Sequence, residues 1–341
     1  MSRKLTGVTI LLVSVLAGRA AIAQDSPNYA KAKQEGEVRW YTTNIIDTGV
    51  IPIVTAFEKR YPGVKVIYSR GDSPQTVVKI LNEAKAGRIE ADVVGGTGTS
   101  APLQKAGLLT PYKVMNWDAI PTERKDPNGY WTSNILYFHT PAVNTDLVKP
   151  ADIPTKLEDL LSPKWKGKLS WSTSSLGGPA FIGSVLVGLG EEKGMEFLRK
   201  LAKQDVISLG VSARAAVERV SAGEYAVALG ILNFHAQIDT EKGAPVRWLP
   251  IEPILGTFSV EAVLKDAPRP NAARLFVDFL MSEEAARVLA NAGFLPALPT
   301  VPAKTPSLKP EGGNFKANFV TPDFLADNTE KWMGLRKDLF E

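Results

Sequence analysis

The chain has 341 residues, a formal net charge of +4 and no cysteine. The lack of cysteine excludes disulfide bonds, thiolate metal sites and the cysteine-linked anchor of a lipoprotein. Arg3, Lys4 and Arg19 carry three of the four excess positive charges, so the rest of the chain has a net charge of +1 and gives no argument for a nucleic-acid partner.

Residues 1–23 have the pattern of a secretory signal peptide. Arg3 and Lys4 precede a short apolar run at 8–16, and Ala21-Ile22-Ala23 forms a small-x-small cleavage site before Gln24. The run is too short to span a bilayer. A large exported chain without disulfides is typical of the Gram-negative periplasm, so we expect a periplasmic protein. Removing 23 residues leaves 318, a length that favours two domains.

Helices and strands alternate in the first part of this remainder. β-Prone runs are separated by segments with helical spacing, and turn residues such as Tyr61-Pro62-Gly63 divide them. This alternation favours a parallel α/β sheet. The pattern predicts a helix at 25–35, a strand at 37–43, a helix at 51–60, a strand at 64–68, a helix at 73–86, a strand at 91–94 and a short helix at 101–106.

A strand at 135–144 is expected to cross to a second α/β series. That series comprises helices at 156–161, 179–189, 191–203 and 213–222 and strands at 168–171, 206–209 and 225–232. A β-prone run at 258–264 is a second candidate crossing. Amphipathic helices at 270–280 and 282–290 follow, and the tail at 299–341 contains one predicted helix at 328–338.

Five short motifs in this order resemble family 1 of the extracellular solute-binding proteins of ABC importers, in the branch whose best-known members bind ferric iron. The motifs are ADVV at 91–94 with LQKAGLL at 103–109, PAVNTDLV at 141–148, LLSPKWKGK at 160–168, VSAGEYA at 220–226, and APRPNAA at 267–273 with FLMS at 279–282.

This resemblance implies a bilobed fold, with two α/β lobes joined by crossing β-strands. It places residues 24–137 and 260–300 in lobe 1 and residues 138–259 in lobe 2, and it leaves 301–341 unassigned. It also implies a monomer without catalytic activity or cofactor. Such a protein traps a small-molecule ligand by hinge closure and delivers it in a transient contact to an ABC permease.

At the positions where ferric members of this family bind iron, the sequence differs from the family pattern. Ferric members place adjacent tyrosines after a strand of the second lobe, where this chain reads Ile231-Leu232-Asn233-Phe234-His235. Many of them carry a histidine in the first loop, which reads Thr42-Thr43-Asn44 here. The metal cage is therefore mostly missing, and we expect a phosphorylated or carboxylated organic anion. Ferric iron with a synergistic anion is the alternative, for which Tyr41, Tyr137 or His235 would have to serve as ligands.

The anion site is predicted at the carboxyl ends of the strands, where open α/β sheets bind ligands. Several loops there precede helices, whose N-termini favour anions. Arginines would contribute bidentate contacts, and aromatic rings would stack on the ligand. The candidate residues are Thr42, Thr43, Asn44, Arg70, Gly96, Thr97, Trp171, Ser172, Thr173, Ser174, Ser175, Ser212, Arg214, Asn233 and Phe234.

Structural roles remain open alternatives for these residues. The hydroxyls at 172–175 could form an ordinary helix cap, the glycines at 95–98 a bare turn, and Trp171 part of the core. Arg70 and Arg214 could be solvated or ion-paired. Enzymatic function is disfavoured, because the sequence contains neither G-x-S-x-G nor H-E-x-x-H.

Overall fold

The computed structural model describes residues 27–174 and 176–341. The predicted signal peptide and Ser175 lie outside the described residues.

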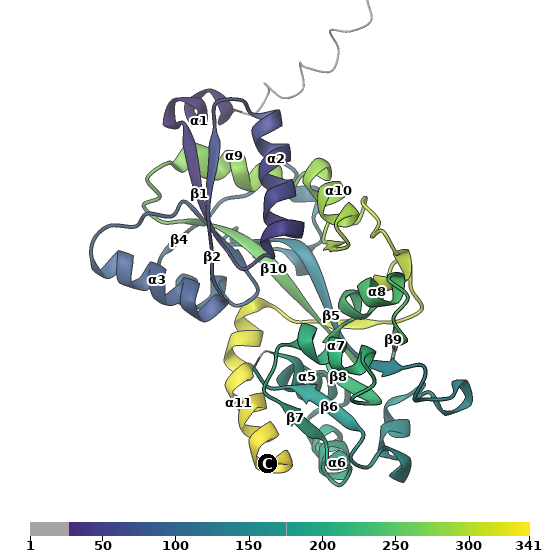
Figure 1. The fold of residues 1–341 in the computed structure, drawn as a ribbon. Helices are drawn as coiled ribbons and strands as arrows, with labels where there is room; N and C mark the ends of the chain where they lie inside the picture. The colour runs from purple at the N-terminus through teal and green to yellow at the C-terminus, as the bar shows by residue number, and fades with distance from the viewer. Residues whose placement is uncertain (1–26, 175) are drawn as a thin grey trace, which may run out of the picture.

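Two lobes are joined by the long strands β5 (Thr132–Asn144) and β10 (Ile254–Leu264) (Figure 1). These strands pair antiparallel, with Glu261 opposite Thr132 and Leu255 opposite His139. Their neighbours extend them into one sheet with the main strand order β2-β1-β3-β10-β5-β8-β6-β7. Both segments predicted to cross between lobes lie within these two strands.

Lobe 1 is built on parallel strands, with the crossing strand β10 antiparallel to β3. Its core includes Trp40 and Phe57, whose rings meet Phe276 of the helix α9 edge-on at 5.3 and 5.0 Å. The elements are α1 (Tyr29–Glu35), β1 (Glu37–Thr42), the π-helix Ile46–Val50, α2 (Ile51–Arg60), β2 (Lys65–Arg70), α3 (Ser73–Lys85), β3 (Val93–Gly96), α4 (Ser100–Lys105), β4 (Leu109–Thr110), α9 (Pro270–Leu280), α10 (Glu283–Asn291) and β11 (Leu295–Pro296).

Lobe 2 repeats this plan, with parallel strands and the crossing strand β5 antiparallel to β8. A separate buried cluster that includes Trp165, Trp171 and Phe181 forms its core. The elements are β6 (Leu169–Ser172), α5 (Gly177–Leu189), α6 (Glu191–Ala202), β7 (Ile207–Leu209), α7 (Ala213–Ser221), β8 (Val227–Leu232), α8 (Asn233–Glu241) and β9 (Val246–Trp248).

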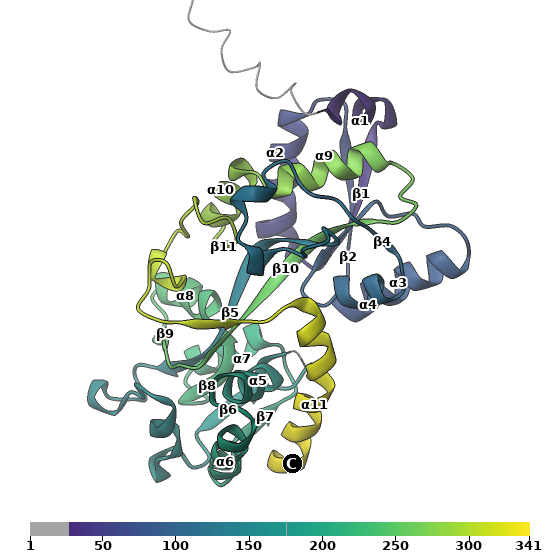
Figure 2. The ribbon, with the colours of Figure 1, turned by 180° about the vertical axis from the view of Figure 1, so that it is seen from behind.

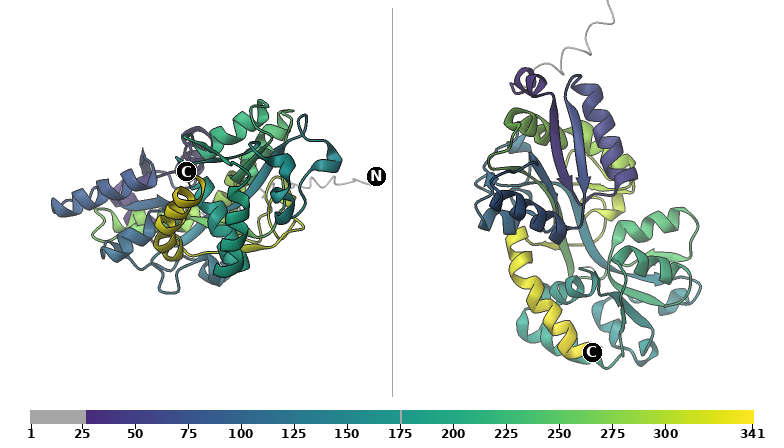
Figure 3. Two further views of the ribbon diagram at one scale, coloured as in Figure 1. Left: turned by 90° about the horizontal axis from the view of Figure 1, so that it is seen from below. Right: turned by 60° about the vertical axis from the view of Figure 1, so that its left-hand side comes forward.

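The C-terminal segment returns from lobe 1 to lobe 2 (Figures 2 and 3). Strand β12 (Ala317–Phe319) pairs with β10, and helix α11 (Pro322–Phe340) then packs on α5. Trp332 is buried against Gly183 of α5, where an added Cβ would lie 2.6 Å from the indole ring. The final helix is therefore packed into lobe 2.

Three predicted elements differ from the structure. The predicted helix at 156–161 is a 3-10 helix, Leu157–Leu161, and the final helix begins at Pro322 instead of residue 328. The segment predicted as a loop at 233–235 is the first turn of α8. Because α8 begins directly after β8, helical geometry sets the directions of the side chains at 233–235.

Candidate functional site

The carboxyl ends of the strands in the two lobes face each other along the crossing strands. In lobe 1, β3 ends at Gly96, which pairs with Val260 of β10. In lobe 2, β8 ends at Leu232, which pairs with His139 of β5, and His139 in turn lies opposite Leu255 of β10. The two ends are thus separated by five residues of β10, or about 17 Å at ~3.3 Å per residue. The loops that follow these strands form the candidate site.

In lobe 1, the loops after β1 and β3 are in contact. The Thr42 hydroxyl accepts a hydrogen bond from the Asn44 amide at 3.2 Å, which tightens the first loop. Gly96 has a φ of 141°, and a Cβ at this position would lie 2.6 Å from Thr43 Cγ2. The structure therefore brings Thr42, Thr43, Asn44 and Gly96 together, with Thr97 next in the chain. The Asn44 Oδ1 atom is buried and has no hydrogen-bond partner.

Arg70, at the end of β2, forms an exposed ion pair with Asp72 at 3.0 Å. Exposed pairs contribute little free energy, since solvent screens them and side-chain ordering opposes them. An anion could therefore compete with Asp72 for this guanidinium.

In lobe 2, two of the predicted hydroxyls fasten neighbouring loops together. Ser172 donates to the Val211 carbonyl at 2.6 Å, and Thr173 donates to the Leu209 carbonyl at 3.0 Å. Ser212 caps α7 by accepting a hydrogen bond from the Ala215 amide at 3.2 Å. Ser174, in the loop that follows β6, is exposed.

The two glycines after these hydroxyls have a packing role. A Cβ on Gly177 would lie 3.0 Å from Ser172 Cβ, and one on Gly178 would lie 3.1 Å from the Ser172 carbonyl oxygen. Their lack of side chains lets the start of α5 lie directly on the end of β6. Part of the small-residue pattern is thus explained by helix–strand packing.

Trp171 is a core residue, which corrects the expectation that its ring stacks on a ligand. The side chain is fully buried, its Nε1 donates to Ser208 Oγ at 3.2 Å, and its ring meets Phe340 of α11 edge-on at 4.5 Å. Phe340 is distant in sequence, so the local pattern around Trp171 gave no sign of this contact.

The Arg214 guanidinium is occupied by contacts within lobe 2. It pairs with Asp239 at 2.5 Å, donates to the His235 carbonyl at 2.8 Å and pairs with Glu218 at 3.0 Å. These contacts fix the first turn of α8 against α7. These contacts favour a positioning role for Arg214, and its bidentate contact to an anion stays a prediction.

The first turn of α8 is directed toward the crossing strands. Asn233 is buried and donates to the Leu308 carbonyl at 2.8 Å, while its Oδ1 atom has no partner. Phe234 is buried and stacks on Tyr137 with ring centroids 6.0 Å apart. Burial, the Arg214 guanidinium and His139 lower the pKa of His235 to about 3. The turn therefore presents neutral groups at neutral pH.

The tyrosines named for the iron alternative are in different environments. The Tyr41 hydroxyl donates to Glu83 at 2.8 Å, and burial and this carboxylate raise its pKa. Burial raises the pKa of Tyr137 to about 12. Within residues 27–174 and 176–341, no group of three or more His, Cys, Asp or Glu side chains is arranged to hold a metal ion.

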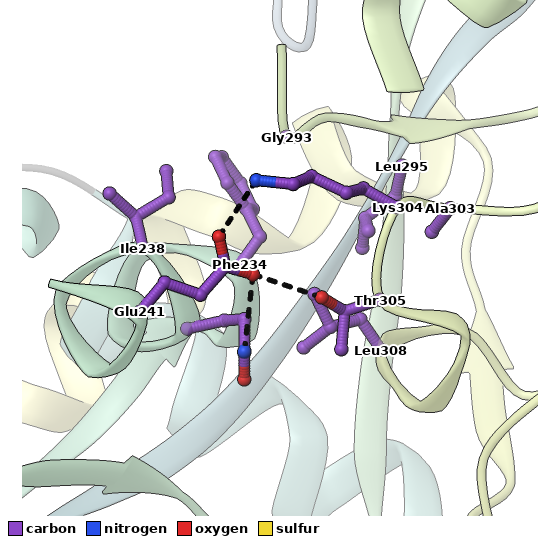
Figure 4. A pocket seen from close by; sticks show the side chains of 10 residues that line it. Phe234, Ile238, Glu241, Gly293, Leu295, Ala303, Lys304, Thr305 and Leu308 are labelled. Carbon is purple, nitrogen blue, oxygen red and sulfur yellow. Dashed lines mark hydrogen bonds and ion pairs between the residues drawn. The ribbon is translucent and has the colours of Figure 1, made fainter. Parts of the chain in front are cut away.

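A small pocket lies between α8 and the segment 293–308 (Figure 4). Glu241 accepts hydrogen bonds there from Lys304 at 2.9 Å, Thr305 at 3.0 Å and Gln237 at 3.3 Å. These contacts fasten the return segment to α8. Phe234 is the only predicted site residue among those lining the pocket.

In the part of the chain that the structure describes, no helix combines the length and apolar character needed to cross a membrane.

Residues 90–328 match the profile of the family described as bacterial extracellular solute-binding proteins. The structure of iron-bound HitA from Pseudomonas aeruginosa is 26% identical in sequence to this chain, with a TM-score of 0.73. The match covers 89% of this chain and 99% of the HitA chain. AfuA from Actinobacillus pleuropneumoniae with fructose-6-phosphate bound is 23% identical, with coverage of 90% and 99% and a TM-score of 0.69. A putative 2-aminoethylphosphonate-binding periplasmic protein of Salmonella typhimurium is 25% identical and covers 83% of this chain and 81% of its own.

These similarities confirm the predicted bilobed α/β fold and the resemblance to the ferric-binding branch. They also place the chain among binding proteins instead of enzymes. Because the family profile covers well over half of its residues, the chain belongs to the bacterial extracellular solute-binding proteins and is a periplasmic substrate-binding protein of ABC transport.

Proposed function

We propose that the protein captures a small organic anion, phosphorylated or carboxylated, between its two lobes. Thr43, Asn44 and Thr97 would contribute donors from lobe 1, and Ser174 would contribute one from lobe 2. The observation that carries the proposal is the register of the crossing strands, since it sets these loops face to face. Closure about β5 and β10 would bring both sets of donors onto one ligand.

The donor set favours an anion over a bare metal ion. Hydroxyls, amides and backbone N–H groups at helix starts bind phosphate and carboxylate oxygens. Ferric iron would need anionic oxygen ligands, yet the α8 turn supplies Asn233 and Phe234, and the Tyr41 hydroxyl is bonded to Glu83. The similarity to AfuA and to the Salmonella protein supports a phosphorylated or phosphonate ligand. The similarity to HitA supports the iron alternative.

Export and delivery complete the proposal. Residues 1–23 would be removed on export to the periplasm, and the closed monomer would deliver its ligand to a permease in the inner membrane. N-terminal sequencing of protein isolated from the periplasm should begin at Gln24, and a start at Met1 would contradict the cleavage.

Calorimetry on protein refolded free of ligand tests the ligand class. Fructose 6-phosphate, 2-aminoethylphosphonate, citrate and ferric citrate would be titrated separately. We expect a saturable heat with at least one of the three iron-free anions. Binding of ferric citrate alone, with a visible phenolate charge-transfer band, would favour the iron alternative.

A further inference from the structure

A buried carboxyl group lies in lobe 1 on the crossing strand β10. Glu261 is 1% exposed. Trp40 Nε1 donates to its Oε2 at 3.0 Å, and Asn134 Nδ2 donates to its Oε1 at 3.1 Å. Both donors are neutral, and no lysine or arginine of the described residues acts on this carboxyl. An ionised carboxylate in such a place is costly, because no opposite charge compensates for its lost hydration.

Glu261 lies directly against the end of strand β3. It pairs with Gly95 across the antiparallel register, and a Cβ on Gly95 would lie 2.4 Å from Glu261 Oε2. At the next residue, Gly96, an added Cβ would lie 2.6 Å from Thr43 Cγ2. The backbone at Gly95 and Gly96 thus runs between the Glu261 carboxyl and the Thr43 side chain. This close approach explains why the sequence has two glycines here.

The surroundings accommodate the acid form of Glu261. Burial raises its pKa to about 8, against the opposing effect of the hydrogen bonds from Trp40 and Asn134. The Asn134 Oδ1 atom is buried without a partner, so rotation of this amide by a half-turn would offer an acceptor to the acid proton. Among the described residues, the titratable side chain that interacts with Glu261 is Tyr137 on β5, and Glu261 helps to raise its pKa.

We propose that Glu261 is a positioning residue held as the neutral acid, which fixes the end of β3 at Gly95 and Gly96 against Thr43. Ionisation places an unpaired charge beneath this strand end and loosens it. The lobe 1 half of the ligand site then loses its geometry in alkaline solution. This last consequence rests on the proposed function, whereas the state of Glu261 and of the strand end does not.

Unfolding of the ligand-free protein by urea between pH 4 and 9.5 tests the charge state. The folded-state pKa lies above the ordinary value of 4.5, so the contribution of Glu261 to stability is complete below that value and is lost as the pH rises to about 8. We expect wild type to lose stability relative to Glu261→Gln across this window. The exposed control Glu158→Gln should follow wild type throughout. Parallel curves for wild type and Glu261→Gln would overturn the proposal.

A second measurement needs no variant of Glu261. The indole N–H resonance of Trp40, assigned by its absence in Trp40→Phe, should titrate in wild type with a midpoint near pH 8. A shift that stays constant from pH 6 to 9.5 would overturn the proposal, even if Glu261→Gln does not fold. Hydrogen exchange at residues 95–99, corrected for its intrinsic pH dependence, should accelerate between pH 6 and 9.

The ligand consequence is tested with fructose 6-phosphate and 2-aminoethylphosphonate as probes. The affinity of the one that binds should fall several-fold between pH 7 and 9 in wild type and stay level in Glu261→Gln. An equal fall in both proteins would overturn the link to the site. If neither probe binds, the proposed ligand class is in error, while the two ligand-free measurements still decide the role of Glu261.

Discussion

Replacing Arg214 with methionine separates a positioning role from direct ligand binding. Methionine keeps an apolar stem of similar length and removes the guanidinium. Asp239, whose side chain is 9% exposed, would then lose its ion pair at 2.5 Å, and the His235 carbonyl would lose a donor. Breaking a buried pair costs about 3–5 kcal/mol. Because the Arg214 side chain is 31% exposed, we expect a smaller loss of about 2–3 kcal/mol in the free energy of unfolding.

Urea unfolding followed by circular dichroism measures this loss. The control is Arg219→Met on the same helix, since the ion pair of Arg219 within the described residues is an exposed one with Glu224 at 3.6 Å. That variant should lie within about 0.5 kcal/mol of wild type. A double-mutant cycle of Arg214→Met with Asp239→Asn should give a coupling energy above about 1 kcal/mol. Unchanged stability of Arg214→Met, together with a large loss of anion affinity, would refute the positioning role.

Two further predictions concern α11 and the hydroxyl donors. Trp332→Ala should reduce the free energy of unfolding by about 3–5 kcal/mol, because it empties the volume that the indole fills against Gly183. Trp332→Phe should recover part of this loss. A loss below about 1 kcal/mol in Trp332→Ala would show that α11 is not part of the lobe 2 core. Thr43→Val and Ser174→Ala should each weaken anion binding by about 1–2 kcal/mol in calorimetry with little change in melting temperature, and unaltered affinity would remove that residue from the site.

The alternation of strands and helices could be predicted from the sequence because each lobe packs helices against its sheet. Helix α8 was missed because Leu232, at its N-cap position, offers no polar capping side chain. The start of α11 does carry a sequence signal, since Thr321 caps the helix by accepting a hydrogen bond from the Phe324 amide and Pro322 occupies the first turn.

The candidate site was predicted at the carboxyl ends of the parallel strands, and its location stays a prediction. The structure shows what several of its individual residues contact. The hydroxyls of Ser172 and Thr173, however, donate to carbonyls in the loop after β7 and at the end of β7, and Trp171 packs on Phe340. Such partners are distant in sequence and become visible only when the chain folds. No sequence motif marks Glu261, because its proposed role depends on its contact with Gly95 of β3.

The central claim is that the facing loops of the two lobes hold an organic anion through hydroxyl and amide donors. Its most direct test is native mass spectrometry of the protein isolated from its own periplasm, followed by identification of the released ligand. We predict one bound organic molecule that carries a phosphate, phosphonate or carboxylate group. One equivalent of bound iron without an organic anion would contradict the account.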